Sequence, residues 1–239
     1  QAALITGGAK RIGREIALVL ARAGADVVIT YNASDREARR TADDIARLGV
    51  RAFAVRCDVR DEASVKTAVA DARRALGRID ILVNNAAIYE TVDFDKLTAA
   101  RWDNMFATNA RGPFLMAKHA AKELRRREGR IINIGSLGGL RPWATHAHYC
   151  ASKAALHTLT QAMAKAYAPD IVVNCLAPGM IEASNDKGTP HARRFAAKTP
   201  MQRNGSAQDV AEMVRLLAIA PRFVTGQIIA VDGGLELAT

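Results

Sequence analysis

Tyr149 and Lys153 are the residues whose chemistry most narrows the possible functions of this chain. A spacing of four residues places both side chains on one face of a helix. A phenol alone is a poor acid at neutral pH, because its unperturbed pKa is about 10. A cation close by lowers that pKa and makes proton exchange with a substrate oxygen feasible. Since Tyr and Lys at this spacing are also common on solvated helix faces, the surrounding elements must decide between the two interpretations.

Short apolar runs alternate with longer amphipathic stretches along the chain. Because the apolar runs are continuous rather than alternating, they are typical of a parallel sheet that is covered on both faces. The sequence therefore predicts a single doubly wound Rossmann-type α/β domain over residues 1–239. Strands are expected at residues 2–6, 26–31, 51–56, 80–84, 130–135, 171–175 and 227–231. Helices are expected at residues 12–23, 35–48, 61–76, 98–127 (with a kink or break at Gly112 and Pro113), 148–167 and 206–219.

Residues 180–205 form the one region that reads as irregular, with polar residues and two prolines, Pro190 and Pro200. A long irregular segment inside a compact domain is often functional. We therefore expect it to be a lid over a site rather than a domain linker.

A glycine-rich turn follows the first expected strand and opens the first helix. Gly7, Gly8 and Gly13 let the backbone turn sharply and approach a pyrophosphate. The helix N-terminus adds free N–H groups and a partial positive charge. The spacing is not GxGxxG, since Arg11 stands in place of the middle glycine. A plain strand-to-helix turn explains one or two of these glycines but not all three, so the turn predicts dinucleotide binding.

Composition excludes several other classes of protein. The net charge is +10, but the arginines are spread over many segments without interleaved aromatic residues, which favours solvated helix faces over nucleic-acid binding. No apolar run approaches the ~20 residues that span a membrane. Cys57, Cys150 and Cys175 are widely spaced, as expected of reduced, buried thiols in a cytoplasmic protein. Gln1 starts inside an expected strand, so native residues are expected to precede it.

Further motifs follow the expected strands in a fixed order. Ser136 lies thirteen residues before Tyr149, and Asn109 lies in the long helical stretch. The chain resembles the short-chain dehydrogenase/reductase family over nearly its whole length, and within it the 3-oxoacyl-(acyl carrier protein) reductases. The resemblance implies about seven strands in the order 3-2-1-4-5-6-7. The remaining motifs are Cys57-Asp58-Val59, Asn84-Asn85-Ala86-Ala87, Pro178-Gly179 and Asp232-Gly233-Gly234, with Ala87 in place of the usual glycine.

The resemblance implies roles for four residues. Tyr149 would be the general acid of carbonyl reduction, and Lys153 would lower its pKa and bond the nicotinamide ribose. Ser136 would hold the substrate oxygen and stabilise developing negative charge. Asn109 would order a water that relays protons to Lys153. The alternatives are that Ser136 only caps its loop and that Asn109 only bonds neighbouring backbone.

The cofactor is expected to be NADP(H). NAD-preferring Rossmann proteins place an acid at the end of the second strand, whereas here no acid occurs before Asp35. Arg11 could face a 2′-phosphate, with Ser34 and Asn32 as hydrogen-bond donors, or could simply be exposed to solvent. Asp58 would accept from the adenine amine, or cap the following turn. The residues expected to bind the cofactor are Gly7, Arg11, Ile12, Gly13, Tyr31, Asn32, Ser34, Asp58, Val59, Asn85, Ala86, Ala87, Tyr149, Lys153, Pro178, Gly179 and Ile181.

The substrate is less well defined by sequence. In the family the loop before the tyrosine lines the substrate pocket, which points to Leu137, Trp143 and His146. His146 could bond a polar substrate or be merely a loop residue. His146 and His148 lack a third metal ligand, so no metal is expected. The basic residues that could attract an anionic substrate or carrier are Arg141, His191, Arg193, Arg194 and Lys198.

Three functions remain possible at this point. The first is an NADPH-dependent reductase of a small ketone or of a carrier-protein or CoA 3-oxoacyl thioester. The second is a pteridine-type reductase acting on a C=N bond, which Arg11 favours, because that group shares its TGxxxRxG turn, and Ser136 disfavours, because Asp often stands there. The third is a non-catalytic dinucleotide sensor, for which the Ser136, Tyr149 and Lys153 set would have no chemical use. The family also implies a homotetramer or homodimer.

Overall fold

A seven-stranded parallel sheet forms the centre of the molecule in the computed structural model, which describes residues 1–182 and 188–238. The strand order is β3-β2-β1-β4-β5-β6-β7, and it confirms the order that the family resemblance implies. The strands are β1 (Ala2–Ile5), β2 (Asp26–Tyr31), β3 (Ala52–Arg56), β4 (Ile81–Asn84), β5 (Arg130–Ile134), β6 (Val172–Pro178) and β7 (Ile228–Val231). The helices are α1 (Arg11–Arg22), α2 (Asp35–Ala46), α3 (Glu62–Leu76), α4 (Ala99–Phe106), α5 (Gly112–Arg125), α6 (Ala147–Tyr167), α7 (Pro190–Lys198) and α8 (Ala207–Ile219).

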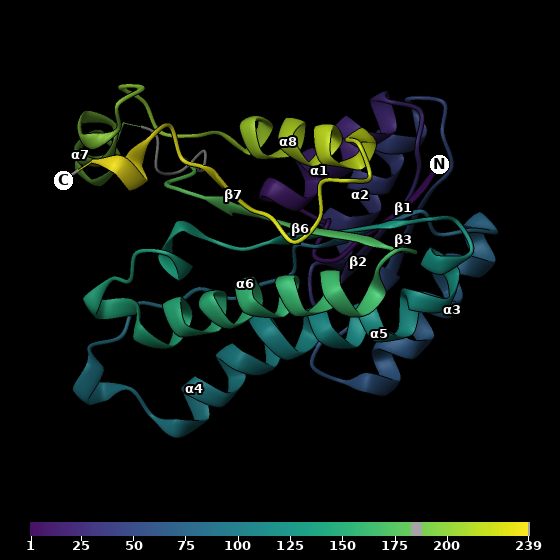
Figure 1. Ribbon diagram of the computed structural model, residues 1–239. Coiled ribbons are helices and arrows are strands. Elements are labelled where there is room, and N and C mark those ends of the chain that lie inside the picture. Colours follow the sequence, from purple (N-terminus) through teal and green to yellow (C-terminus); the bar gives the residue numbers. More distant parts are fainter. Residues whose placement is uncertain (183–187, 239) are drawn as a thin grey trace.

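Two helical layers cover the sheet, with α1, α2 and α8 on one face and α3, α5 and α6 on the other (Figure 1). Successive residues of a strand serve opposite faces. Ile5 of β1 packs in the core under α1, whereas its neighbour Leu4 packs in the core under α3 and α5. Because both faces are buried, every position of β1 is apolar, which explains the continuous runs in the sequence.

Local sequence determines where several helices begin and end. The Asp61 carboxylate accepts a hydrogen bond from the Ala63 N–H at the start of α3, and Gly77 ends that helix with a left-handed φ of 75°. Ser206 and Asp209 form a reciprocal capping box at the start of α8. The caps at the helix starts fix the ends of the loops that come from the carboxyl edge of the sheet, and Gly77 fixes the turn that leads into β4.

The stretch 98–127 differs from its expected form. It contains α4, a π-helical segment (Ala107–Arg111) and α5, so the irregularity precedes the expected break at Gly112 and Pro113. Arg111 and Gly112 keep right-handed helical angles, so the chain stays helical from the π-helical segment into Pro113 and α5. The π-helical segment carries Asn109 and thereby sets the direction of a candidate site residue.

The expected irregular region 180–205 contains helix α7. The Thr189 hydroxyl caps it by accepting from the Ala192 N–H, and Pro190 occupies its first position. The proline that read as a loop signal is thus a helix-start signal. Residues 183–187 of the region lie outside the described residues.

Three further findings concern membrane-spanning helices, the cysteines and metal ligands. None of the described helices combines the length and apolarity needed to cross a membrane. Cys57, Cys150 and Cys175 are all buried free thiols. Within residues 1–182 and 188–238, no three His, Cys, Asp or Glu side chains are arranged to hold a metal ion.

Replacing Gly13 should destabilise the protein, because a Cβ at this position would overlap the Gly7 carbonyl oxygen and lie 2.5 Å from Asn85 Nδ2. We expect Gly13→Ala to lower the free energy of unfolding by about 1–3 kcal/mol, as overpacking does elsewhere. Gly49→Ala is the control, since a Cβ there meets open space and only its left-handed φ of 86° is strained. Urea unfolding measures both, and an unchanged Gly13→Ala would show that this close approach is not required.

Candidate active site

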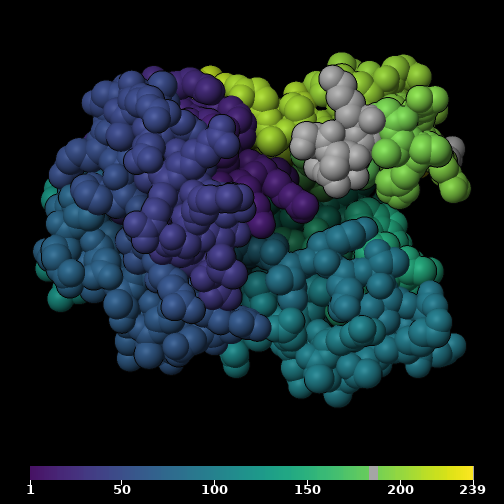
Figure 2. Space-filling model, turned by 180° about the vertical axis from the view of Figure 1, so that it is seen from behind, coloured from purple at the N-terminus to yellow at the C-terminus, as the bar shows by residue number. Residues whose placement is uncertain are grey.

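Two cavities lie at the carboxyl ends of the strands, where open α/β sheets bind their ligands. The first, of about 520 Å³, is bounded by the turns that follow β1, β2, β3 and β4. The second, of about 800 Å³, lies beyond β5 and β6 and is bounded by α7. Tyr89 lines both, so the two cavities adjoin. Figure 2 shows the surface hollowed between the purple N-terminal segment and the teal middle of the chain, the two segments that border the first cavity.

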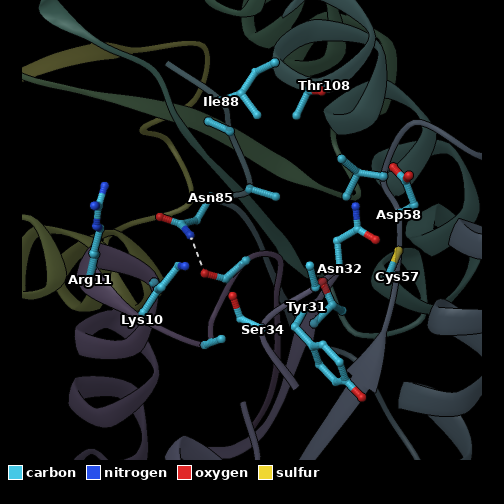
Figure 3. A pocket seen from close by; sticks show the side chains of 18 of the residues that line it. Lys10, Arg11, Tyr31, Asn32, Ser34, Cys57, Asp58, Asn85, Ile88 and Thr108 are labelled. Carbon is cyan, nitrogen blue, oxygen red and sulfur yellow. Dashed lines mark hydrogen bonds between the residues drawn. The ribbon is translucent and has the colours of Figure 1, made fainter. Parts of the chain in front are cut away.

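The glycine turn is held against the loop after β4 by a compact set of hydrogen bonds. Thr6 Oγ1 accepts from the backbone N–H groups of Asn85 and Ala86, each at 3.0 Å. Asn85 Nδ2 donates to the carbonyl oxygens of Thr6 (2.9 Å) and Gly7 (3.0 Å), and the dashed line in Figure 3 marks the bond to Gly7. A Cβ on Gly7 would lie 2.9 Å from Ala86 Cα. The glycine turn can therefore approach the loop after β4 this closely only because it carries no side chain at Gly7, which fits a site that takes a pyrophosphate.

The start of α1 is electropositive and has no internal counter-charge. Its first turn contains no acidic residue, and among the described residues no side chain caps its N–H groups. Lys10 and Arg11 are exposed at this end and line the cavity, and Arg11 adopts a left-handed φ of 52°. Free N–H groups, the helix dipole and two cations together make a binding site for an anion.

On the side of the first cavity that is formed by the end of β2, the described lining includes no Asp or Glu from that strand. Tyr31 lines it, but the Tyr31 hydroxyl donates to Asp35 Oδ1 (2.6 Å), and Asp35 also pairs with Arg39 (2.8 Å). Asp58 is held by the Arg60 guanidinium, with Nη2 2.6 Å from Oδ2. Figure 3 shows Lys10 and Arg11 on one side of the cavity and Asp58 on the other. The expected cofactor residues that line this cavity are Gly7, Arg11, Ile12, Gly13, Tyr31, Asn32, Ser34, Asp58, Val59, Asn85, Ala86 and Ala87.

The second cavity brings together most of the remaining expected residues. Those that line it are Ser136, Trp143, His146, Tyr149, Gly179 and Ile181. Leu137 is 3% exposed, and it is not among the described residues that line either cavity. Pro178 is likewise buried, at the end of β6. Both of these residues therefore support the walls rather than form them.

Lys153 is buried beneath the second cavity. Its side chain is 3% exposed, and Nζ donates to the Ile134 carbonyl oxygen at 2.8 Å. Nζ lies 5.8 Å from the centre of the Tyr149 ring. Burial lowers the pKa of Lys153 to about 8, because the cation has lost its hydration. Its ammonium group can therefore release a proton near neutral pH.

The pKa of Tyr149 differs from the expected direction. Burial raises it to about 12, and a weaker opposing effect comes from the Ser136 hydroxyl. Lys153 is not among the groups that shift this pKa, for which desolvation of the phenolate outweighs the benefit of nearby polar groups, so its expected lowering effect stays a prediction. Tyr149 is consequently held as a protonated phenol, the form that can donate.

Ser136 and Asn109 both make the local bonds that the alternative interpretations expected. Ser136 Oγ accepts from the Gly138 N–H (3.1 Å), which leaves the hydroxyl hydrogen free to be donated. Asn109 Nδ2 donates to Ile88 O (3.0 Å) and Ser152 Oγ (3.1 Å), and Asn109 Oδ1 accepts from the Ile88 N–H (2.9 Å). Asn109 thus ties the π-helical segment to the loop after β4 and to α6.

Two residues of the site were missed from the sequence. Tyr89 stacks on His146 with ring centres 4.9 Å apart, meets Tyr149 edge-on at 4.9 Å, and its hydroxyl lies 2.6 Å from His146 Nε2. His157 is buried, and its Nε2 accepts from the Ser136 N–H at 3.4 Å. The signal for His157 was available, because it lies four residues after Lys153 on the same helix face. Tyr89 had only its place two residues after Ala87.

Known proteins match this chain over almost its full length. The family described as enoyl-(acyl carrier protein) reductase matches residues 7–236. The short-chain dehydrogenase/reductase eriH of Hericium erinaceus is 37% identical, over 97% of this chain and 96% of its own. The 3-oxoacyl-[acyl-carrier-protein] reductase FabG of Staphylococcus aureus is 34% identical, over 99% and 98%.

Solved structures agree with these matches. A short-chain dehydrogenase/reductase from Serratia marcescens superimposes with a TM-score of 0.94 at 32% identity, over 99% of this chain and 98% of its own. A blue fluorescent protein from a metagenomic library, in complex with NADPH, has a TM-score of 0.92 at 34% identity, over 98% and 97%. The chain belongs to the short-chain dehydrogenase/reductase family of oxidoreductases, which bind a nicotinamide dinucleotide.

The burial of His157 should appear in the pH dependence of stability. Desolvation, and to a lesser degree the charge of Lys153, lowers the pKa of His157 to about 4. Between that value and the unfolded value of about 6.5 the unfolded chain binds more protons, so His157 makes stability fall as pH decreases through this window. We expect His157→Leu to show a shallower fall in urea unfolding between pH 6.5 and 4. Exposed His191→Leu is the control, and parallel curves for wild type and His157→Leu would contradict the burial argument.

Proposed function

We propose that this protein is an NADPH-dependent carbonyl reductase that acts on a 3-oxoacyl thioester or a small ketone. The observation that carries the proposal is the shared wall of Ser136 and Tyr149 in the second cavity, directly beside the glycine-cradled first cavity. A phenol kept protonated by burial and a serine hydroxyl with a free hydrogen are the two donors that a carbonyl oxygen needs. The relatives whose names state a 3-oxoacyl reductase activity support the same class of reaction.

NADPH, when bound in the first cavity, would supply the hydride to the carbonyl carbon. Tyr149 then donates its phenolic proton to the carbonyl oxygen, so that the ketone leaves as an alcohol. Ser136 donates a hydrogen bond to the same oxygen and stabilises the negative charge that develops on it. Lys153, with its pKa near 8, restores the proton of Tyr149 and limits charge separation in a desolvated site. Asn109 positions α6 through Ser152, one residue from Lys153.

The preference for NADPH rests on the charges of the first cavity. Lys10 and Arg11 offer cations for a 2′-phosphate, and Asn32 and Ser34 line the same space. The nearest acid after β2, Asp35, is already bonded to Tyr31 and Arg39. The NADPH complex of the 34% identical blue fluorescent protein supports this assignment.

The other functions are less well supported. A pteridine-type reductase is favoured by Arg11 in the cofactor turn, but Ser136 is a neutral hydroxyl where C=N reduction in that group often uses an acid. A dinucleotide sensor would not need the buried Lys153 beside Tyr149.

We also propose that residues 180–205 act as a lid, since α7 lines the second cavity. We further propose that the protein is a homodimer or homotetramer, because the exposed rings of Trp102 and Phe114 suit contact with another subunit.

Removing the Tyr149 hydroxyl should abolish reduction but not cofactor binding. We expect Tyr149→Phe to lower kcat with any ketone substrate by at least 100-fold, because a positioned general acid contributes about 10²–10⁴-fold. The Kd for NADPH, measured by fluorescence titration, should change by less than a few fold. Retention of reductase activity in this variant would overturn the proposed role. Loss of NADPH binding would instead indicate that the variant is misfolded, which circular dichroism would show.

Replacement of Arg11 should weaken the preference for NADPH. We expect wild type to have a higher kcat/KM with NADPH than with NADH, and Arg11→Gln to reduce that ratio roughly tenfold, equivalent to about 1.4 kcal/mol. Arg36→Gln is the matched control, since Arg36 is an exposed residue on α2 outside the cavity. Equal or better use of NADH by wild type would refute the assignment of NADPH.

A further inference from the structure

Helix α7 presents a basic face to the second cavity. His191, Arg194, Phe195 and Lys198 line it, at the i, i+3, i+4 and i+7 positions that share one side of a helix. Arg194 and Lys198 are exposed, whereas the His191 ring packs on Phe195 with centres 4.9 Å apart. Figure 1 places α7 beside the C-terminal segment, whose Leu235 also lines the cavity. Two cationic side chains therefore border the same space as Tyr149.

These cations have no counter-charge in the part of the chain that the structure describes. The described residues that line the cavity include no Asp or Glu, and neither Arg194 nor Lys198 forms an ion pair with any of residues 1–182 or 188–238. Nearby Arg203, by contrast, is paired with Asp209 at 2.8 Å. A cavity with a one-sided positive wall attracts ligands of the opposite charge.

Another part of the cavity wall is polar and carries no Lys or Arg. It consists of aromatic rings and hydroxyl groups: Tyr89, Thr91, Trp143, Thr145 and His146. Burial, and to a lesser degree the neighbouring His148, lowers the pKa of His146 and so favours its neutral form. Its Nε2 is engaged by the hydroxyls of Tyr89 (2.6 Å) and Thr91 (2.9 Å). The positive charge of the cavity is thus concentrated on α7, while the reacting hydroxyls of Ser136 and Tyr149 lie elsewhere on the wall.

We propose that the substrate is a carbonyl compound with an anionic group, a carboxylate or a phosphate, which binds Arg194 and Lys198 while the carbonyl oxygen lies against Ser136 and Tyr149. The inference rests on the proposed reductase function. Guanidinium and ammonium groups bind both anions through charge-assisted hydrogen bonds. The anion can come from a small oxo acid or from the phosphate of a CoA or phosphopantetheine thioester, and the two sources are separable by experiment.

The test compares ketones that are matched except for an anionic group. Levulinate is paired with methyl levulinate, and acetoacetyl-4′-phosphopantetheine with the neutral thioester acetoacetyl-pantetheine, each assayed by NADPH oxidation. We expect kcat/KM to be at least tenfold higher for the anionic member of at least one pair. A preference in the first pair identifies a small oxo acid, and a preference in the second identifies a phosphate-bearing thioester.

Variants on α7 assign the preference to its residues. Arg194→Gln combined with Lys198→Gln should lower kcat/KM for the preferred anion at least tenfold relative to kcat/KM for its neutral partner, mainly through a higher KM for the anion. Arg193→Gln is the matched control, because Arg193 is an exposed cation of the same helix that does not line the cavity. Raised salt should weaken the wild-type preference and have little effect on the double variant.

The outcomes distinguish failure of the anion-binding inference from failure of the proposed reductase function. Reduction of the neutral ketones with no anion preference, or a preference that survives the double variant, overturns the inference and leaves the reductase function standing. A preference lost equally in Arg193→Gln also overturns it, since general charge then explains the effect. Failure to reduce any ketone overturns the proposed function and the inference together.

Discussion

The burial of Lys153 is the constraint around which the site is organised. An ammonium group removed from water loses several kcal/mol of hydration unless it is paired or discharged. Here Nζ donates to the Ile134 carbonyl, a neutral acceptor at the end of β5, and the lowered pKa of Lys153 reflects the remaining penalty. Because of this desolvation penalty, the burial of Lys153 does not stabilise the fold. The surrounding fold must overcompensate, and the two apolar layers against the sheet do so.

Several neighbouring features follow from that buried cation. His157 lies one turn along α6, and the charge of Lys153 helps to keep it neutral, so its Nε2 can accept from the Ser136 N–H. The imidazole fits only because Gly135 and Gly139 have no side chains: a Cβ on either would collide with the ring. The glycines, the histidine and the lysine together determine the backbone course of the loop that carries Ser136. Ser136 is therefore positioned by the His157 ring that packs against its loop, whereas Tyr149 is positioned by helix α6 itself.

The sequence predicted the sheet and the placement of the Tyr149 and Lys153 pair, because burial on both strand faces and a four-residue helical spacing are local properties. It could not predict that burial raises the pKa of Tyr149, since desolvation depends on what packs around the phenol rather than on its sequence neighbours. Tyr89 and His146 are 57 residues apart, and their stacking arises from two loops that meet only in the folded chain. Helix α7 was missed because a proline at its first position resembles a loop signal.

Each of the two cavities is bordered by a pair of cationic side chains. The net charge of +10 is mostly spread over paired or solvated side chains, but Lys10 and Arg11 border one cavity and Arg194 and Lys198 the other. Ser136 and Tyr149 line the second cavity together with Arg194 and Lys198, and Tyr89 borders both cavities. Positive potential from these cations stabilises negative charge on an oxygen held at Ser136 and Tyr149, and the low dielectric of the site strengthens that effect. In the reaction that we propose, the same field that would gather anionic ligands would assist the step in which a carbonyl oxygen becomes negative before Tyr149 protonates it.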